Sequence, residues 1–222
     1  IDKTADEYAI LLDDFFAQSA LAPDGWRGVA IVSVVPPLTA TFQELCRRYF
    51  EIDPLMVTAS VNSGMPIRYD NPLALGADRW VAAVAAKEKY GAPVIVIDFG
   101  TATTFNAVNR AGEFVGGAIA PGLDLAADAL HRATAQLPRI DLALPPRAIA
   151  TNTIHGIQSG ILFGSVELIK GMVARMRAEL GEPSARVIAT GGLARMLAPE
   201  TKIIEAVERD LVLEGLRLVF ET

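Results

Sequence analysis

The stretch Pro93-Val-Ile-Val-Ile-Asp-Phe-Gly-Thr-Ala-Thr-Thr104 decides the fold class, because it joins an apolar strand to a polar turn. A continuous apolar run of this length is typical of a strand that helices cover on both faces. The run ends at Asp98, and Gly100 and Thr101 follow. Glycine lets backbone N–H groups approach phosphate oxygens, and a carboxylate at a strand end can hold a cation that offsets phosphate charge. An ordinary tight turn uses the same residue types, but the hydroxyl groups after Gly100 favour a phosphate site.

Strands and helices alternate on both sides of this stretch. Upstream, the patterns predict a helix that begins at the capping box Thr4–Glu7 and a buried strand over 28–35. Two further helices are predicted, one around Cys46 and one over 76–90. Downstream, they predict a β-hairpin over 103–120 and a long helix over 153–180. A strand over 186–190 and a closing helix over 211–220 follow. This alternation predicts an α/β protein with a mostly buried sheet. The Gly-Ala-Pro segment at 91–93 is the predicted domain boundary.

Composition excludes several classes of partner. With 20 Lys and Arg against 26 Asp and Glu, the net charge is −6, and no basic run with interleaved aromatic residues is present. We therefore expect no nucleic-acid partner. No apolar stretch reaches the roughly 18 uncharged residues of a spanning helix, and the N-terminus has no signal pattern, so we expect no membrane and a cytoplasmic protein. Cys46, His131 and His155 have no spacing that suggests a zinc site.

A second polar segment, Gly76-Ala-Asp-Arg79, stands at a predicted helix start. Asp78 in the first turn could simply interact favourably with the helix dipole. Alternatively, Asp78 is a general base and Arg79 is a cation beside it. Phosphoryl transfer needs the proton of the attacking hydroxyl accepted and the phosphate charge balanced, and these two side chains could supply both.

A third segment, Thr190-Gly191-Gly192, lies between a predicted strand and a helix. Two glycines there allow close backbone approach to an adenine or ribose, although a glycine-assisted turn is an equally good interpretation. The sequence contains neither the G-x-x-x-x-G-K-[ST] pattern of a P-loop nor a G-x-G-x-x-G pattern after a strand, so neither of those nucleotide sites is predicted.

Seven segments, in order and across nearly the whole chain, resemble the type III pantothenate kinases. They are Thr4–Tyr8, Ile67–Pro72, Gly76–Arg79, Asp98–Thr104, Gly116–Gly122, Ala150–Thr153 and Thr190–Gly192. The resemblance implies the actin-like ATPase fold, with two similar RNase-H-like halves, at 1–90 and 91–222, and a central cleft that binds ATP. It also implies the first step of coenzyme A synthesis, the ATP-dependent phosphorylation of pantothenate.

The resemblance also implies roles for individual residues. Asp78 resembles the family's catalytic base, and the pantothenate pocket would contain Tyr69, Gly76, Ala77, Arg79 and Thr153. Asp98 is similar to the ligand of a monovalent cation, K⁺ or NH₄⁺. Gly100, Thr101, Gly191 and Gly192 would contact the nucleotide, which carries Mg²⁺. A homodimer is implied too, with Thr153 near its interface. Independently, the 153–180 helix has an apolar face that suggests a two-fold dimer, formed by Ile154, Ile157, Ile161, Leu162, Val166 and Ile169.

One feature departs from the family pattern. Members begin with a strand that carries Asp-x-Gly-Asn-Thr, the first phosphate-binding loop, and this motif does not occur in the sequence. We therefore expect either an upstream hairpin or a degenerate relative. Two other functions remain open, namely a non-catalytic binding or transcriptional accessory protein on the same fold, and another actin-like kinase of a small molecule such as a sugar or acetate.

Overall fold

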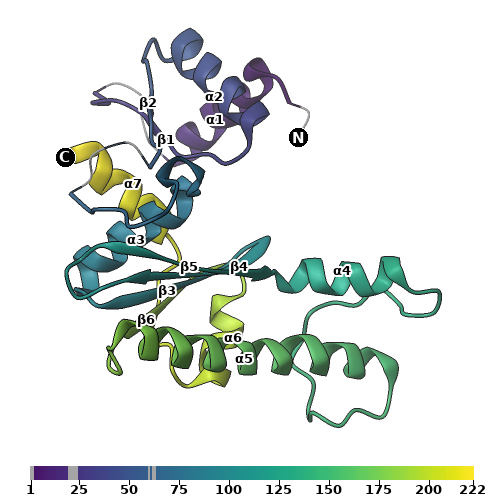
Figure 1. The fold of residues 1–222 in the computed structure, drawn as a ribbon. Helices are drawn as coiled ribbons and strands as arrows, with labels where there is room; N and C mark the ends of the chain where they lie inside the picture. The colour runs from purple at the N-terminus through teal and green to yellow at the C-terminus, as the bar shows by residue number, and fades with distance from the viewer. Residues whose placement is uncertain (1–2, 20–24, 60, 62–63) are drawn as a thin grey trace.

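The computed structural model describes residues 3–19, 25–59, 61 and 64–222. Figure 1 shows the elements in their order along the chain, which is α1 (Ala5–Gln18), β1 (Ala30–Ile31), α2 (Pro36–Tyr49), β2 (Leu55–Met56), η1 (Pro72–Ala74), α3 (Ala77–Tyr90), β3 (Val94–Phe99), β4 (Ala102–Val108), β5 (Phe114–Pro121), α4 (Leu123–Ala133), α5 (Thr153–Leu180), β6 (Arg186–Gly191), α6 (Ala194–Thr201), β7 (Ala206–Val207) and α7 (Leu211–Glu221).

A five-stranded sheet forms the centre of the molecule, with strand order β5-β4-β3-β6-β7. β3, β4 and β5 form an antiparallel meander, and β6 and β7 run parallel to β3. This is the RNase-H-like arrangement expected for one half of the fold. The predicted hairpin is confirmed as β4 and β5, which are joined by a turn in which Gly112 donates to the carbonyl of Asn109 over 2.9 Å.

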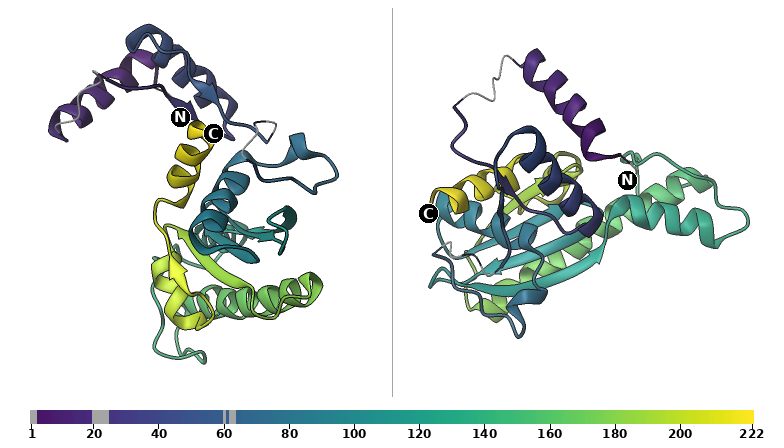
Figure 2. Two further views of the ribbon diagram at one scale, coloured as in Figure 1. Left: turned by 90° about the vertical axis from the view of Figure 1, so that its left-hand side faces the viewer. Right: turned by 90° about the horizontal axis from the view of Figure 1, so that it is seen from above.

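Helices cover both faces of this sheet, which explains the continuous apolar run in β3. Figures 1 and 2 show α5 and α6 on one face and α3 and α7 on the other. Ile95 and Ile97 lie in the core beneath α5, whereas Val94 and Val96 lie in the core beneath α3. Successive residues of β3 thus enter different cores, so both faces of the strand have to be apolar.

The N-terminal part of the chain forms a smaller unit above α7. α1 begins at the predicted capping box, in which the Thr4 side chain accepts from the Glu7 N–H and the Glu7 carboxylate accepts from the Thr4 N–H. The predicted buried strand over 28–35 is wrong in extent, because only Ala30–Ile31 is a strand. Within the described part of the chain it pairs, in parallel, only with β2, and its two residues are partly buried.

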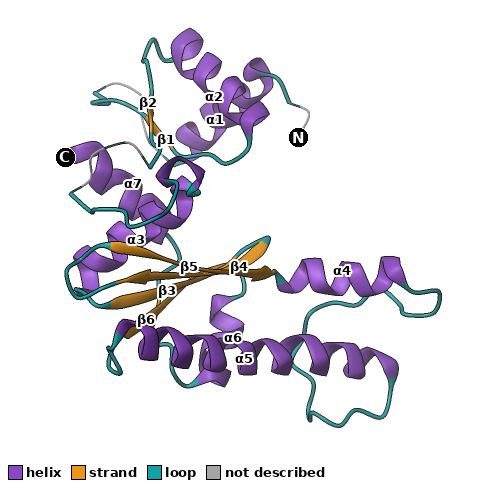
Figure 3. Cartoon of the chain, in the orientation of Figure 1, coloured by secondary structure: helices purple, strands orange, loops and turns teal. Residues whose placement is uncertain are grey.

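The longest helix, α5, extends past the sheet. Its first half lies beside α4, away from α3, and its second half packs under the sheet (Figures 1 and 3). By length and composition α5 could cross a membrane, since an 18-residue window has a mean hydropathy of 1.2. However, Leu162 and Ile169 are completely buried in the core beneath the sheet. We therefore interpret its apolar character as that of a core helix.

The apolar α5 face proposed for dimer contact has a different role. Five of its six residues are buried inside this chain, namely Ile157, Ile161, Leu162, Val166 and Ile169, and only Ile154 is exposed. Helical periodicity marks an apolar face without revealing which surface covers it, and most of this face packs inside the chain. Ile157 and Ile161 also line the groove between α4 and α5, and the homodimer stays a prediction.

Candidate active site

A row of polar side chains crosses the sheet on the face that α3 covers. Asp98 of β3 is in register with Thr104 of β4 on one side and with Thr190 of β6 on the other. The next row towards the start of β3 contains Ile188, Val96 and Asn106. Because alternate residues of a strand share a face, the α3 face is apolar over most of its area and polar at the carboxyl end of β3.

Asp98 is the carboxylate at the centre of this polar row. Burial raises its pKa, and the nearby charge of Asp78 raises it further. Two carboxylates, one from the end of β3 and one from the start of α3, therefore share one electrostatic environment. Such a pair favours protonation of one member or the arrival of a cation.

Glycines bound the space around Asp98. Gly191 has a φ of +90°, and a Cβ there would lie 2.6 Å from Asp98 Oδ1, so only glycine fits between β6 and this carboxylate. Gly192 is exposed, and nothing lies within 4 Å of the position of its Cβ. In the turn after β3, Gly100 and Thr101 are exposed, and the Thr101 carbonyl accepts from the Gly122 N–H at 3.1 Å.

The start of α3 is built around Gly76, its N-cap residue. Asp78 Oδ1 accepts from the Arg79 N–H at 2.9 Å, and a Cβ on Gly76 would lie 2.7 Å from that same oxygen. Ala77 is buried while Asp78 is only partly buried. Glycine at the N-cap therefore gives the Asp78 carboxylate room at the open end of the helix.

Arg79 is buried, with 9% of its surface exposed. Its Nε donates to Asn106 Oδ1 at 2.7 Å, and Asn106 Nδ2 donates to Thr104 Oγ1 at 3.1 Å. Among the described residues, two buried side-chain nitrogens lack a partner, Arg79 Nη2 and Trp80 Nε1. A buried guanidinium nitrogen without an acceptor is costly, so the position next to Arg79 Nη2 is suited to an oxygen atom of a ligand.

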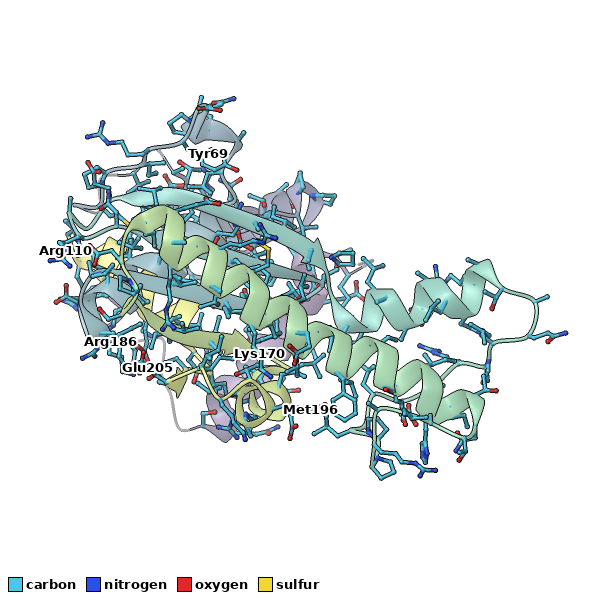
Figure 4. The ribbon with its side chains drawn as sticks, turned by 60° about the horizontal axis from the view of Figure 1, so that its bottom comes forward. Tyr69, Arg110, Lys170, Arg186, Met196 and Glu205 are labelled. Atoms are coloured by element: carbon cyan, nitrogen blue, oxygen red, sulfur yellow. The ribbon has the colours of Figure 1, made fainter. Side chains whose placement is uncertain are left out.

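Tyr69 reaches the same region from the loop before η1. The loop adds to the edge of β5, where Arg68 N–H donates to the Phe114 carbonyl at 2.7 Å and Phe114 N–H donates to the Pro66 carbonyl at 2.9 Å. Figure 4 shows Tyr69 in this loop, next to the sheet edge. A Cβ on Gly116 would lie 3.8 Å from the Tyr69 ring. The loop thus fixes Tyr69 over β5.

The backbone of Gly117 in β5 packs beside the Arg79 guanidinium. A Cβ on Gly117 would lie 3.1 Å from Arg79 Nη2 and 1.7 Å from the carbonyl oxygen of Phe105. Consecutive glycines in β5 therefore let Tyr69 and Arg79 approach the backbone closely. A small substrate could lie against this stretch of bare backbone.

Thr153 lies apart from these residues in the same chain. It begins α5 and is exposed, and it lines an apolar groove of about 1160 Å³ between α4 and α5. Three glycines spaced four residues apart, Gly156, Gly160 and Gly164, line the groove along α5. Within one chain, the structure does not bring Thr153 to Asp78.

The other predicted site residues gather at one edge of the sheet. Asp98, Gly100, Thr101, Gly191 and Gly192 come from the ends of β3 and β6, and Asp78 is electrostatically coupled to Asp98 from the start of α3. Sequence reasoning missed Asn106. The available signal was its position two residues after Thr104 in a strand, which places both side chains on one face.

The site has no metal-binding cluster of the usual protein type. Among the described residues, no group of three or more His, Cys, Asp and Glu side chains could hold a metal ion. The groups at the site that could bind a cation are therefore one or two carboxylates and the neighbouring hydroxyl groups. Such a donor set fits a cation that is shared with substrate phosphates.

A sheet with the RNase-H-like strand order, whose carboxyl edge carries a buried carboxylate, a glycine-bounded turn and a second carboxylate at a helix start, is the arrangement expected of one half of an actin-like α/β kinase. The profile of one family, described as type III pantothenate kinase, matches residues 1–175. The chain belongs to the type III pantothenate kinase family.

Curated relatives with that name extend the match beyond the profile. The protein of Roseiflexus castenholzii is 51% identical over 99% of this chain and 86% of its own length. That of Geobacter sulfurreducens is 52% identical over the same shares. Both identities are high enough that the same family assignment holds for residues 176–222.

A solved structure from Campylobacter jejuni supports the fold. It is described as a conserved Baf family transcriptional activator, and it is 17% identical to this chain, with a TM-score of 0.61 over 95% of this chain and 87% of its own. At this identity the likeness concerns the fold alone.

Proposed function

We propose that this chain transfers the γ-phosphoryl group of ATP to the primary hydroxyl of pantothenate, giving 4′-phosphopantothenate. The observation that carries the proposal is the pairing, in the first turn of α3, of the partly exposed carboxylate of Asp78 with the buried guanidinium of Arg79, next to Asp98. Family membership supports the choice of pantothenate as the acceptor.

Asp78 acts as the general base. The hydroxyl oxygen of pantothenate attacks the γ-phosphorus, the bond from that phosphorus to the β–γ bridging oxygen breaks, ADP leaves, and the hydroxyl proton passes to the Asp78 carboxylate. Asp78 suits this role because its Oδ1 is held by the Arg79 N–H while the side chain stays partly exposed. Most of the rate would come from positioning and electrostatics.

Arg79, Tyr69, Gly76 and Ala77 bind pantothenate. Arg79 Nη2 has no protein partner and lies against the bare backbone of Gly117, so it can donate to the carboxylate of pantothenate. Tyr69 lies over the neighbouring Gly116 and supplies an aromatic wall. Gly76 and Ala77 leave the space at the helix start open.

The nucleotide binds at the ends of β3 and β6. The backbone of Gly100 and Thr101 contacts phosphate, and Gly191 and Gly192 allow the ribose or adenine to approach. Asp98, with hydroxyl-bearing Thr104 and Thr190 in register on either side, fits a monovalent cation, K⁺ or NH₄⁺. Mg²⁺ would enter with ATP, since it is commonly bound by one or two carboxylates together with substrate phosphates. Each cation would offset the negative charge of the phosphates and of the carboxylates that bind it.

We further propose a homodimer, in which the groove between α4 and α5 receives the same face of a second copy. Exposed apolar side chains line the groove, namely Leu125, Leu130 and Leu168. A two-fold contact there would bring Thr153 of each chain towards the interface, where it could reach the pantothenate of the partner. A cytoplasmic location and a division into halves at 1–90 and 91–222 complete the proposal.

Product formation in a coupled assay tests the reaction. ADP release should require pantothenate, and glucose or acetate should not replace it. Turnover with glucose or acetate but not with pantothenate would assign the site to another actin-like kinase. ATP binding with no turnover on any of the three acceptors would favour a non-catalytic binding protein.

A further inference from the structure

The buried side chain of Asn106 makes its closest polar contact with Arg79. Asn106 is fully buried in the middle of β4, on the face that α3 covers. Its amide oxygen accepts from Arg79 Nε at 2.7 Å, a short hydrogen bond to a charged donor. A polar side chain with no exposed surface has to satisfy its own hydrogen bonds, and Asn106 does so through Arg79 and Thr104.

Thr104 fixes which way the Asn106 amide faces. Asn106 Nδ2 donates to Thr104 Oγ1 at 3.1 Å, and this contact places the amide oxygen, not the nitrogen, towards Arg79. If the amide were reversed, its N–H groups would face the Nε–H of Arg79, donor against donor. Thr104 and Asn106 lie two residues apart on one strand, so the backbone itself sets the distance between them.

The guanidinium held in this way offers its other end to a ligand. Nε is bound to Asn106, whereas Nη2 is buried beside Gly117 without an acceptor. Arginine recognises carboxylates through the fixed, planar arrangement of its donors, so the orientation of the plane decides whether Nη2 faces the substrate. An asparagine supports this orientation and adds no charge, which leaves the positive charge of Arg79 available to an anion.

We propose that Asn106 and Thr104 are positioning residues that lock the Arg79 guanidinium in the orientation that binds the carboxylate of pantothenate. This inference rests on the proposed role of Arg79. Neither residue touches the substrate, and both act through Arg79. Their loss should therefore weaken the binding of pantothenate more than the binding of ATP.

The experiment compares kcat and the KM of each substrate in Asn106→Leu, Asn106→Asp and Thr104→Val. Asn106→Leu should raise the KM for pantothenate about 10- to 100-fold, the usual effect of losing a hydrogen bond to a charged group, and change the KM for ATP less than about twofold. Asn106→Asp keeps an acceptor for Nε but pairs its own charge with Arg79, so it should also raise the KM for pantothenate. Thr104→Val, nearly isosteric, should raise the pantothenate KM about threefold.

A double-mutant cycle with Arg79→Met separates positioning from a general loss of structure. If Asn106 acts through Arg79, Asn106→Leu should add less than about a twofold change in pantothenate KM when Arg79 is already methionine. A full effect of Asn106→Leu in that background would overturn the proposal. So would an unchanged pantothenate KM in folded Asn106→Leu, or in Thr104→Val if the leucine variant fails to fold.

Failure of the proposed function gives a different result. If Arg79→Met alone leaves the pantothenate KM unchanged, Arg79 does not bind pantothenate, and both the proposed role and the inference fall. If Arg79→Met raises that KM while Asn106→Leu and Thr104→Val do not, the role of Arg79 stands and only the positioning inference is wrong. Thermal unfolding of each variant shows whether the folded enzyme was measured.

Discussion

The carboxylates of Asp78 and Asp98 share one electrostatic environment, although they come from the start of a helix and the end of a strand. Burial raises the pKa of Asp98 most, and the charge of Asp78 adds to that effect. Two negative charges so placed repel each other. A cation would stabilise both carboxylates in their ionised forms.

Asp98→Asn should stabilise the free protein at neutral pH. The pKa of Asp98 in the folded state is raised above the ordinary value of 3.8, so the unfolded chain ionises first as pH rises. The folded state then binds more protons, and wild-type stability falls with rising pH from about 3.8 up to the raised pKa. Melting temperatures of both proteins in choline buffer should be similar below that pH range and diverge above it in favour of the variant.

The effect of potassium on wild type and on Asp98→Asn tests whether Asp98 binds the cation. Since K⁺ would bind the ionised carboxylate, it should raise the melting temperature of wild type more than that of Asp98→Asn, and catalytic stimulation by K⁺ should disappear in the variant. Equal stabilisation of both proteins by K⁺ would show that Asp98 is not the cation ligand.

Asp78→Asn should lower kcat by about 10² or more while pantothenate still binds, because the amide cannot accept the hydroxyl proton. Steady-state kinetics and calorimetric titration of pantothenate measure the two quantities. Asp124 is the control, since it also lies in the first turn of a helix, α4, and is exposed. If Asp124→Asn lowers kcat as much, the effect comes from helix stability and not from a base.

Gly191→Ala should destabilise the protein by roughly 1–3 kcal/mol, since it combines a φ of +90° with a Cβ only 2.6 Å from Asp98 Oδ1. Gly192→Ala should leave stability unchanged because nothing lies within 4 Å of its Cβ position. Chemical denaturation tests both variants. Equal stability of the two variants would contradict the close fit between Gly191 and Asp98, because it would mean that β6 can move away from the Asp98 side chain at little cost.

Gly160→Leu should prevent dimer formation without harming the fold. A Cβ at Gly160 meets nothing within 4 Å in its own chain, so a leucine there would collide only with a partner in the groove. Gly171→Leu is the control, because it lies on the same helix, is exposed and does not line the groove. Light scattering should show a monomer for the first variant and a dimer for the second.

The same pair of variants tests the role of Thr153. If Thr153 serves the partner's site, Gly160→Leu should also raise the KM for pantothenate, whereas Gly171→Leu should not. A wild-type protein that is monomeric at micromolar concentration would contradict the proposed dimer directly.

The local pattern of the sequence predicted much of the fold. The helix over 153–180 begins and ends as expected, since a single apolar periodicity runs from the Asn152 cap to Gly181 in the left-handed conformation. The β3 strand and its polar end were equally clear. The strand over 28–35 was overestimated, because its apolar residues are only partly buried and its length depends on pairing with β2.

Long-range contacts could not be predicted in this way. The hydrogen bond from Arg79 to Asn106 depends on how α3 packs across β4, and no spacing along the chain encodes that packing. The same applies to Leu162 and Ile169, which look like part of an interface in the sequence and are buried in the chain's own core. Motifs identified the chemistry of the candidate site, whereas its internal supports required the tertiary structure.

The support of α3 by α7 has a consequence for the order of events during protein synthesis. The two helices pack so closely that a Cβ on Gly215 would lie 2.0 Å from the carbonyl oxygen of Val81. α3 carries Asp78 and Arg79 in its first turn, yet the helix that holds it in place is translated much later. On the ribosome, the face of α3 around Val81 therefore lacks its native cover until Leu211–Glu221 emerges, and apolar surface exposed in this way favours aggregation.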